Sequence, residues 1–277
     1  MTGVHVHVGS GGMGVKVLTA GIQVAVEFAR EVNREGAPGA ESNGNASHKI
    51  IRYVDIGGGL PSNYCTDEWA TWHGEEAQST DTSNIIPSFE AYAKHLRAQV
   101  PDLFSGYFEK VVTEFGQSVF AKVGFLASRI EFLKAQKGGP RTAVIHFGAD
   151  CCPRQAYTKE HARRVEAYRA SGEEFEPGPA TSGAAPDAPP VNIAGPLCFQ
   201  GDYLAYDLPL PPALSERDII VLKDVGANSL SMFSRHCSRM SPAVYGYRRG
   251  GSGGSGVRFV QIRKRETAAA LGEYWGC

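Results

Sequence analysis

Hydrophobic and polar positions near the N-terminus follow first a strand period and then a helix period. Val4, Val6 and Val8 alternate with His5 and His7, which predicts a short strand with both imidazoles on one face. A glycine-rich turn follows, and then a helical repeat that ends at Gly36. The apolar positions of this repeat are Val15, Leu18, Ile22, Val26 and Ala29.

The order of strand, turn and helix continues to about residue 118. The segment IIRYVDIGGGLP, residues 50–61, is almost continuously apolar and ends in three glycines, which is typical of a buried parallel strand. A helix is predicted from Ser88 to about Val100, and a third strand lies in EKVVTEFGQS, residues 109–118. Strands that alternate with helices predict a parallel α/β sheet.

The pattern changes from about Val119 to short apolar runs separated by Gly, Pro and Asp turns. Four of these runs are RTAVIHFGAD (141–150), RDIIVLKDVGA (217–227), PAVYGYRR (242–249) and VRFVQIRKRE (257–266). They predict a second half that is mostly antiparallel β. Surface loops are predicted for the Gly-, Pro- and Ser-rich stretches 171–190 and 248–256, and the stretches 36–48 and 73–84 are polar or soft.

Charge and composition narrow the class of function. The 277 residues include 42% hydrophobic residues, which is enough for a sizeable core, and 28 basic residues are balanced by 29 acidic ones. This balance favours neither nucleic acid nor a membrane surface as a partner. Six cysteines without a CxxC pair predict reduced thiols and a cytoplasmic protein, or an organellar one if a targeting segment lies upstream.

Four features could carry chemistry, and each has more than one interpretation. The glycines of VDIGGGLP could present N–H groups to a phosphate or only form a tight turn. His5 and His7 could chelate a metal, line a polar pocket or stack on a flat cofactor ring. Glu114 could be a solvated residue or face a pyridine nitrogen. Cys198 could be a small buried residue or a reactive thiol.

Seven motifs in a fixed order carry a resemblance to a known family. They are VHVHVGS, VDIGGGLP, TEFGQS, GADCCPRQAY, AGPLCFQGD, SMFSRHCSR and IRKRET. The chain resembles, from about Gly3 to about Trp275, the pyridoxal-phosphate-dependent decarboxylases of diaminopimelate, ornithine and arginine, most of all the diaminopimelate type. This resemblance to the alanine-racemase-like fold type III implies the C-terminal part of a (β/α)8 TIM-type barrel over residues 1–118. An antiparallel β-domain is implied over residues 119–277.

The resemblance also implies that the chain binds pyridoxal 5′-phosphate. In this interpretation His7 stacks on the pyridine ring, Ser10 bonds near the phosphate and Glu114 faces the ring nitrogen. Three consecutive glycines would cradle the phosphate. The implied cofactor residues are His7, Ser10, Gly57, Gly58, Gly59, Glu114 and Asn228.

The remaining roles that the resemblance implies concern an amino-acid substrate and a homodimer with shared active sites. Cys198 would enter the site of the other subunit and protonate the carbanion that remains after CO2 departs. Cys198 and His7 are therefore the implied catalytic residues. Arg154 and Tyr157 would hold the distal end of the substrate.

Several positions depart from the family pattern. The family's lysine that forms the Schiff base lies upstream of VHVHVGS, and Lys16 is expected to be a solvated helix residue rather than a substitute. The chain is therefore interpreted as truncated. Gln117 stands where the family has arginine, and Asn228 stands where it has tyrosine. Weaker binding of the cofactor phosphate is therefore expected. Phe199 replaces an acidic residue, which favours a substrate other than diaminopimelate.

Two other functions remain open from the sequence. A catalytically silent homologue that acts as a dimerising or regulatory protein would explain the missing lysine, Gln117 and Asn228. A metal-dependent barrel hydrolase would use His5 and His7, but it leaves GGGLP, TEFGQS and AGPLCFQGD without roles.

Overall fold

The protein divides into two units in its computed structural model. The structure describes residues 2–10, 13–36, 49–74, 85–135, 137–157, 163–175, 189–249 and 256–277. Unit 1 comprises residues 1–126 and 222–227, and unit 2 comprises residues 127–221 and 228–277. The domain boundary predicted after residue 118 falls within unit 1. Most of the two predicted surface loops, 171–190 and 248–256, and most of the polar stretches 36–48 and 73–84 lie outside the described residues.

Unit 1 contains the parallel sheet that the sequence predicts. Its strands are β1 (Gly3–His5), β2 (Tyr53–Asp55) and β3 (Lys110–Val112), in that spatial order. Both strand pairs are parallel. In their register, Gly3 lies opposite Tyr53, and Tyr53 lies opposite Lys110. Each regular strand is only three residues long, and the chain after β2 turns at Gly57, where φ is +69°.

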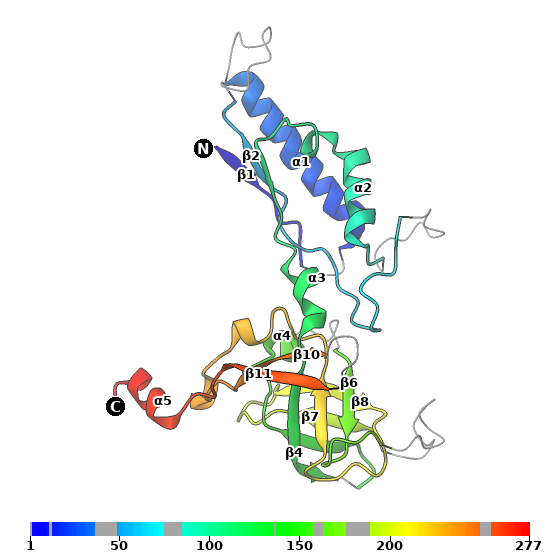
Figure 1. The fold of residues 1–277 in the computed structure, drawn as a ribbon, viewed down its shortest axis with the longest axis vertical. Helices are drawn as coiled ribbons and strands as arrows, with labels where there is room; N and C mark the ends of the chain where they lie inside the picture. The colour runs from blue at the N-terminus through cyan, green and yellow to red at the C-terminus, as the bar shows by residue number, and fades with distance from the viewer. Residues whose placement is uncertain are drawn as a thin grey trace. The chain divides into compact units, whose positions relative to one another are not determined.

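Two helices cover one face of this sheet (Figure 1). The helix α1 (Gly14–Glu35) is the predicted helical repeat, and its five predicted apolar positions are all buried. The second helix, α2 (Phe89–Gln99), begins at the predicted Ser88, whose side chain accepts a hydrogen bond from the Ala91 N–H at 3.1 Å. The amphipathic pattern therefore sets which face of each helix meets the sheet.

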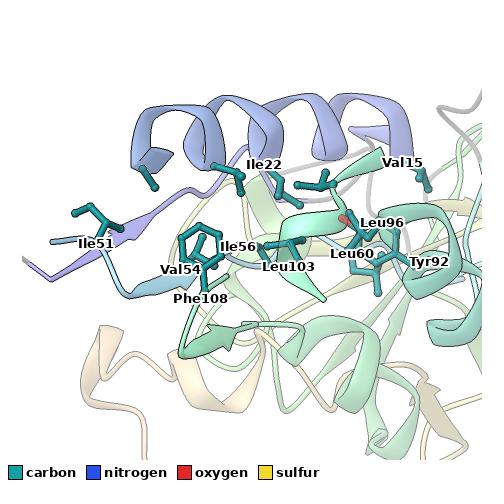
Figure 2. Packing of buried hydrophobic residues seen from close by; sticks show 13 residues of the cluster. Val15, Ile22, Ile51, Val54, Ile56, Leu60, Tyr92, Leu96, Leu103 and Phe108 are labelled. Carbon is teal, nitrogen blue, oxygen red and sulfur yellow. The ribbon is translucent and has the colours of Figure 1, made fainter. Parts of the chain in front are cut away.

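The core of unit 1 lies between these helices and the sheet. Figure 2 shows Ile22 of α1 above Ile56, and Tyr92 and Leu96 of α2 beside Leu60. Val54 at the centre of β2 has no exposed surface. A polar contact extends this packing, because the Asn33 side chain accepts from the Ile51 N–H at 2.7 Å and donates to the Ile51 carbonyl at 3.0 Å. The end of α1 is thereby joined to the start of β2.

Residues 222–227 return to unit 1 and pair with the segment after α3 (Gly116–Phe120). The Val225 N–H donates to the Gly124 carbonyl at 3.0 Å, and the Gly226 N–H donates to the Ala121 carbonyl at 2.9 Å. The buried Lys122 ammonium lies 3.6 Å from a carboxylate oxygen of Asp224.

The described chain also contains short 3-10 helices. They are η3 (Pro101–Leu103), η4 (Ala121–Val123), η6 (Leu230–Met232) and η7 (His236–Ser238).

Unit 2 is built on a six-stranded sheet. In spatial order its strands are β6 (Val165–Tyr168), β9 (Ile219–Leu222), β4 (Leu126–Lys134), β5 (Arg141–Ile145), β7 (Val191–Ala194) and β8 (Tyr203–Leu208). The β4–β5 and β7–β8 pairs are antiparallel, as predicted, whereas β5 and β7 are parallel. The sheet is mixed because the chain between β5 and β7 passes through α4 (Pro153–Tyr157) and β6 before it returns.

The last part of the described chain is a hairpin followed by a helix. The predicted strands β10 (Val244–Arg249) and β11 (Val257–Arg263) form an antiparallel pair. The helix α5 (Ala268–Trp275) begins after Thr267, whose hydroxyl accepts from the Ala270 N–H at 3.2 Å. Among the described residues, no helix has both the length and the apolar character needed to cross a membrane.

Candidate functional site

The first group of predicted site residues lies at the carboxyl edge of the β1–β2–β3 sheet. Hydrogen bonds of the parallel type continue past the regular strands, from the Val6 N–H to the Asp55 carbonyl at 3.0 Å and from the Glu114 N–H to the Gly57 carbonyl at 2.9 Å. His7, the glycine loop and Glu114 are therefore brought together although His7 and Glu114 are more than 100 positions apart in the chain. Carboxyl ends of parallel strands are the usual place for sites in α/β folds.

The His7 ring is held by two contacts that define its tautomer. The Gly58 N–H donates to His7 Nδ1 at 3.2 Å, so Nδ1 carries a lone pair. The proton of the neutral ring is then on Nε2, which lies 3.1 Å from Ser10 Oγ and donates to it. This arrangement links two of the predicted cofactor residues and fixes the plane of the imidazole.

His5 and His7 do not act as a pair. His5 Nδ1 lies 3.2 Å from Asp55 Oδ2, whereas His7 contacts Gly58 and Ser10. Within the described residues, the one three-member group suited to a metal ion is His5, Asp55 and Glu114, whose ligand atoms lie within 4.8 Å of one another. The histidine pair expected for a hydrolase is therefore not the group that the fold assembles.

The glycine loop is shaped by close approaches of the backbone. A Cβ at Gly57, where φ is +69°, would lie 2.2 Å from the Val6 carbonyl oxygen, and a Cβ at Gly59, where φ is +86°, would lie 2.1 Å from the Gly9 carbonyl oxygen. A Cβ at Gly58 would lie 2.8 Å from the Glu114 carbonyl oxygen. Only glycine allows the loop to cross the chain after β1 this closely.

A second group of predicted site residues lies in unit 2. Cys198 is exposed in the loop between β7 and β8, and its Sγ lies 3.3 Å from Cys237 Sγ. The hydrogen bond between these thiols raises the pKa of Cys198. Phe199 stands in edge-to-face contact with His236, with ring centroids 6.4 Å apart. The sequence offers no signal for the Cys237 contact, because the two residues are 39 positions apart.

The other predicted residues of unit 2 lie on separate elements. Arg154 and Tyr157 belong to the short helix α4, and the Tyr157 side chain is 73% exposed. Asn228 adopts φ +53°, a left-handed conformation that asparagine tolerates better than most residues. The site residues are thus divided between the two units.

Two buried aspartates that sequence reasoning did not assign organise the loops around Cys198. Asp202 accepts from the Ala149 N–H at 2.6 Å and from the Leu197 N–H at 2.7 Å. Burial raises the pKa of Asp202, although these N–H groups act in the opposite direction. Asp150 accepts from the Gly148 N–H at 2.8 Å and lies 3.3 Å from Arg239 Nε. Buried carboxylates between loops are a signal that only tertiary structure reveals.

Unit 1 also contains a pocket of about 690 Å³ beside the start of α2. None of the predicted site residues lines it, although Pro61 follows the glycine loop and Ser118 lies on α3. Its other lining residues include Trp69, His73 and Phe89.

The family follows from a match that covers more than half of the chain. Residues 42–226 match the family model described as "Pyridoxal-dependent decarboxylase, C-terminal sheet domain". The chain belongs to the pyridoxal-dependent decarboxylases. This result confirms the family that the seven motifs predict, and it agrees with pyridoxal 5′-phosphate as the family's cofactor.

Curated relatives of this chain are diaminopimelate decarboxylases. The protein of Methanothermobacter thermautotrophicus is 24% identical over 272 residues, which are 97% of this chain and 52% of the relative. The protein of Pseudomonas aeruginosa is 26% identical over 223 residues, which are 80% of this chain and 42% of the relative. The chain therefore spans about half the length of the curated relatives it matches.

Solved structures show the same fold. Diaminopimelate decarboxylase from Helicobacter pylori, complexed with L-lysine, aligns with a TM-score of 0.68 at 20% identity over 99% of this chain and 54% of that one. Lysine/ornithine decarboxylase from Vibrio vulnificus, complexed with cadaverine, aligns with a TM-score of 0.59 at 16% identity over 86% of this chain and 52% of that one. The predicted fold class, part of a barrel followed by a β-domain, is confirmed.

The residues of unit 1 fit the ring and phosphate of pyridoxal phosphate. Gly58 lies between His7 and Glu114, and a Cβ there would lie 3.4 Å from His7 Cε1, so a larger residue would fill the space beside the ring. Within the described part of the chain, the Gly59 N–H has no acceptor. Ser10 is exposed and offers a hydroxyl. This set combines an aromatic face, N–H and O–H donors for an anion and a carboxylate for a ring nitrogen.

Proposed function

We propose that this chain is the C-terminal half of a pyridoxal-phosphate-dependent amino-acid decarboxylase. The observation that carries the proposal is the assembly of His7, Ser10, the glycine loop and Glu114 at one edge of the parallel sheet. Three strands of this edge contribute residues of the types that the family's cofactor requires. We also propose a cytoplasmic location, because all six cysteines are unpaired, as in a reducing compartment.

Each of these residues has a distinct proposed task at the cofactor. The His7 imidazole, held by Gly58 and Ser10, would lie against the pyridine ring. The Glu114 carboxylate would keep a proton on the ring nitrogen. Gly57, Gly58 and Gly59 would surround the phosphate together with Ser10. Pyridoxal phosphate, when bound, supplies an electron sink that stabilises the carbanion formed as CO2 leaves.

The residues of unit 2 would act on the substrate in a homodimer with shared active sites. Cys198 would donate its thiol proton to the substrate carbon after CO2 leaves. Its contact with Cys237 supports this role, because the raised pKa keeps Cys198 protonated. Arg154 and Tyr157 would hold the distal end of the substrate.

The substrate is proposed to be an amino acid other than diaminopimelate. Phe199 follows Cys198 and presents an aromatic ring that cannot pair with a substrate ammonium group as a carboxylate can. Decarboxylation by the full-length protein should therefore be compared over a panel of basic and dicarboxylic amino acids. Preference for diaminopimelate in that panel would contradict this assignment.

The cofactor proposal is tested by an absorbance titration of the purified chain with pyridoxal phosphate. We expect saturable binding that weakens by about tenfold in His7→Ala, because loss of a ring contact of about 1.4 kcal/mol changes affinity by that factor. The matched control is His146→Ala, which removes an exposed histidine whose Nε2 lies 3.1 Å from Glu131. Equal affinity of both variants and the wild type would contradict the proposal.

Borohydride reduction followed by peptide mapping then tests whether a lysine of this chain binds the cofactor covalently. Lys16 is exposed on α1, as the sequence predicts. We expect no lysine of the chain to be labelled at stoichiometric level, because the family's lysine belongs to a part of the relatives that this chain does not match. A fully labelled Lys16 would contradict this expectation and make the chain a candidate enzyme by itself.

The alternative function, a catalytically silent homologue that acts as a dimerising or regulatory protein, stays a prediction. Gln117 and Asn228 favour it, since both remove groups expected near the phosphate. Saturable cofactor binding that depends on His7 and Glu114 would argue against it. Binding that is absent from wild type and variants alike would support it.

A further inference from the structure

Two exposed thiols of unit 2 lie within hydrogen-bond distance of each other. Cys198 Sγ lies 3.3 Å from Cys237 Sγ, and both side chains are exposed. A disulfide requires a sulfur separation of about 2.05 Å, so bond formation needs a movement of roughly 1 Å.

The loop that carries Cys198 is fixed by a buried carboxylate. Asp202 binds the Leu197 N–H at 2.7 Å through its side chain and donates its own N–H to the Phe199 carbonyl at 3.0 Å. It also accepts from the Ala149 N–H at 2.6 Å, on the loop that follows β5. Cys198 therefore lies between two residues that Asp202 anchors.

The loop that carries Cys237 is fixed by the neighbouring Asp150. The Ser234 N–H donates to the Asp150 carbonyl at 2.9 Å, and Arg239 Nε lies 3.3 Å from the Asp150 side chain. Cys237 and Ser238 have φ of +57° and +52°, which is unfavourable for non-glycine residues. A strained backbone that is anchored on both sides holds the Cys237 thiol in a set direction.

We propose that Cys198 and Cys237 form a reversible disulfide when the protein meets a peroxide or a low-molecular-weight disulfide. With hydrogen peroxide, one thiolate attacks an oxygen, the O–O bond breaks, and a sulfenic acid and water form. The second thiolate then attacks the sulfenic sulfur, the S–S bond forms and a second water leaves. Both sulfurs are oxidised, one peroxide is reduced, and the two thiol protons end in water.

The disulfide would remove the proton that Cys198 carries. This consequence rests on the proposed function, in which Cys198 donates that proton to the substrate. An oxidised protein would then be switched off as a decarboxylase, and a thiol reductant would restore it. The link itself does not depend on the proposed function.

The test is oxidation of the full purified chain with hydrogen peroxide, followed by alkylation of remaining thiols and peptide mapping by mass spectrometry. We expect the Cys198–Cys237 peptide pair to exceed any other linked pair by about tenfold or more, because fixed proximity gives the second thiol a high effective concentration. Dithiothreitol should return both cysteines to the alkylated form.

The other cysteines of the chain are internal controls. Cys65 and Cys277 are exposed but outside the pair, so they should be oxidised singly. Cys151 and Cys152 are buried, so peroxide does not reach their thiols and they should stay reduced. The proposal is wrong if Cys198 and Cys237 are both oxidised singly with no link between them.

Two serine variants distinguish a specific loss of the Cys198–Cys237 disulfide from a general loss of folding. Cys237→Ser should abolish the linked peptide and leave Cys198 as a sulfenic acid or a mixed disulfide, whereas Cys65→Ser should leave the link unchanged. Circular dichroism spectra that match the wild type show that each variant folds. If the link forms but the chain binds no pyridoxal phosphate, the redox proposal stands and the proposed function fails.

Discussion

At the scale of single residues, backbone conformation and buried charge decide the geometry of both site groups. Gly57 can turn at φ +69° only because it lacks a Cβ. Asp202 binds two backbone N–H groups of two different loops with its two carboxylate oxygens. One residue thus shapes the glycine loop, and the other joins the loops around Cys198.

Gly57→Ala tests the close approach in the glycine loop. The added Cβ would lie 2.2 Å from the Val6 carbonyl oxygen, a backbone atom that cannot move alone. The control is Gly106→Ala, where φ is +79° but nothing lies within 4 Å of the added atom. Gly106→Ala should lower the free energy of unfolding by about 1 kcal/mol, and Gly57→Ala should lower it by about 2 kcal/mol more. Equal losses in urea unfolding would contradict the steric argument.

Asp202→Asn tests the buried carboxylate. An amide has one acceptor oxygen, so either the Ala149 or the Leu197 N–H loses its partner, and we expect a loss of about 1–3 kcal/mol in the free energy of unfolding. Asp207→Asn is the control, since Asp207 is exposed and asparagine tolerates its φ of +51°. A loss no larger than in this control, measured by urea unfolding, would show that the two N–H bonds contribute little.

The raised pKa of Asp202 predicts how the difference in stability between wild type and Asp202→Asn changes with pH. Burial raises the pKa of Asp202 in the folded state above its ordinary value of 3.8, so the folded state binds more protons than the unfolded one. The stability of wild type relative to Asp202→Asn should therefore fall as pH rises from 3.8 through the raised pKa, and then stay constant. Urea unfolding at a series of pH values measures this difference, and a rise with pH would contradict it.

At the scale of elements, helix α1 packs one of its faces into the core of unit 1. Its inner face presents Val15, Ile22, Val26 and Ala29 to the core, while Val24 on its outer face is 66% exposed. Near the end of α1, the Asn33 side chain accepts a hydrogen bond from the Ile51 N–H and donates one to the Ile51 carbonyl. The helix therefore orients the entry to β2, whose end carries the glycine loop.

Ile22→Ala tests the core contribution of α1. Ile22 is 1% exposed, and its truncation should lower the free energy of unfolding by about 2–5 kcal/mol, because lost burial and a cavity add. Val24→Ala on the opposite face should change it by less than about 0.5 kcal/mol. Similar losses for both variants, measured by thermal or urea unfolding, would mean that α1 does not pack with the face that its pattern indicates.

At the scale of the whole molecule, segments distant in sequence complete unit 1. Residues 222–227 pair with the segment after α3, and a Cβ at Gly226 would lie 1.8 Å from the Phe120 carbonyl oxygen. The Lys122 ammonium donates to the Thr66 carbonyl at 2.6 Å and lies beside Asp224. One buried lysine thus joins three parts of the chain.

Lys122→Met tests this connection. Removal of the ammonium takes away the cation beside Asp224 and the donor to the Thr66 carbonyl, and we expect a loss of about 1–3 kcal/mol in the free energy of unfolding. The double variant Lys122→Met with Asp224→Leu should recover part of this loss, and the exposed Lys110→Met should have little effect. Faster amide exchange in residues 121–126 and 222–227 is the local measurement; unchanged exchange there would contradict the assignment.

The sequence by itself determined the local order of the fold, the family and the candidate residues. Apolar periodicity identified α1 and α2, and alternation followed by glycine identified β1 and β2. Short apolar runs identified β5, β9, β10 and β11, whereas β4, β6, β7 and β8 became visible only in the structure. These features depend on neighbours within a few positions, so they are visible in the chain. The residue roles at the cofactor and substrate came from motifs and stay predictions.

Only the tertiary structure decided which side chains meet. It paired His7 with Gly58 and Ser10, separated His5 from His7 by joining it to Asp55, and made the β5–β7 pair parallel. It also brought Cys198 to Cys237 and buried Asp150 and Asp202 between loops. Such contacts join residues tens of positions apart, and their energies come from burial and hydrogen bonds that exist only once the chain has folded.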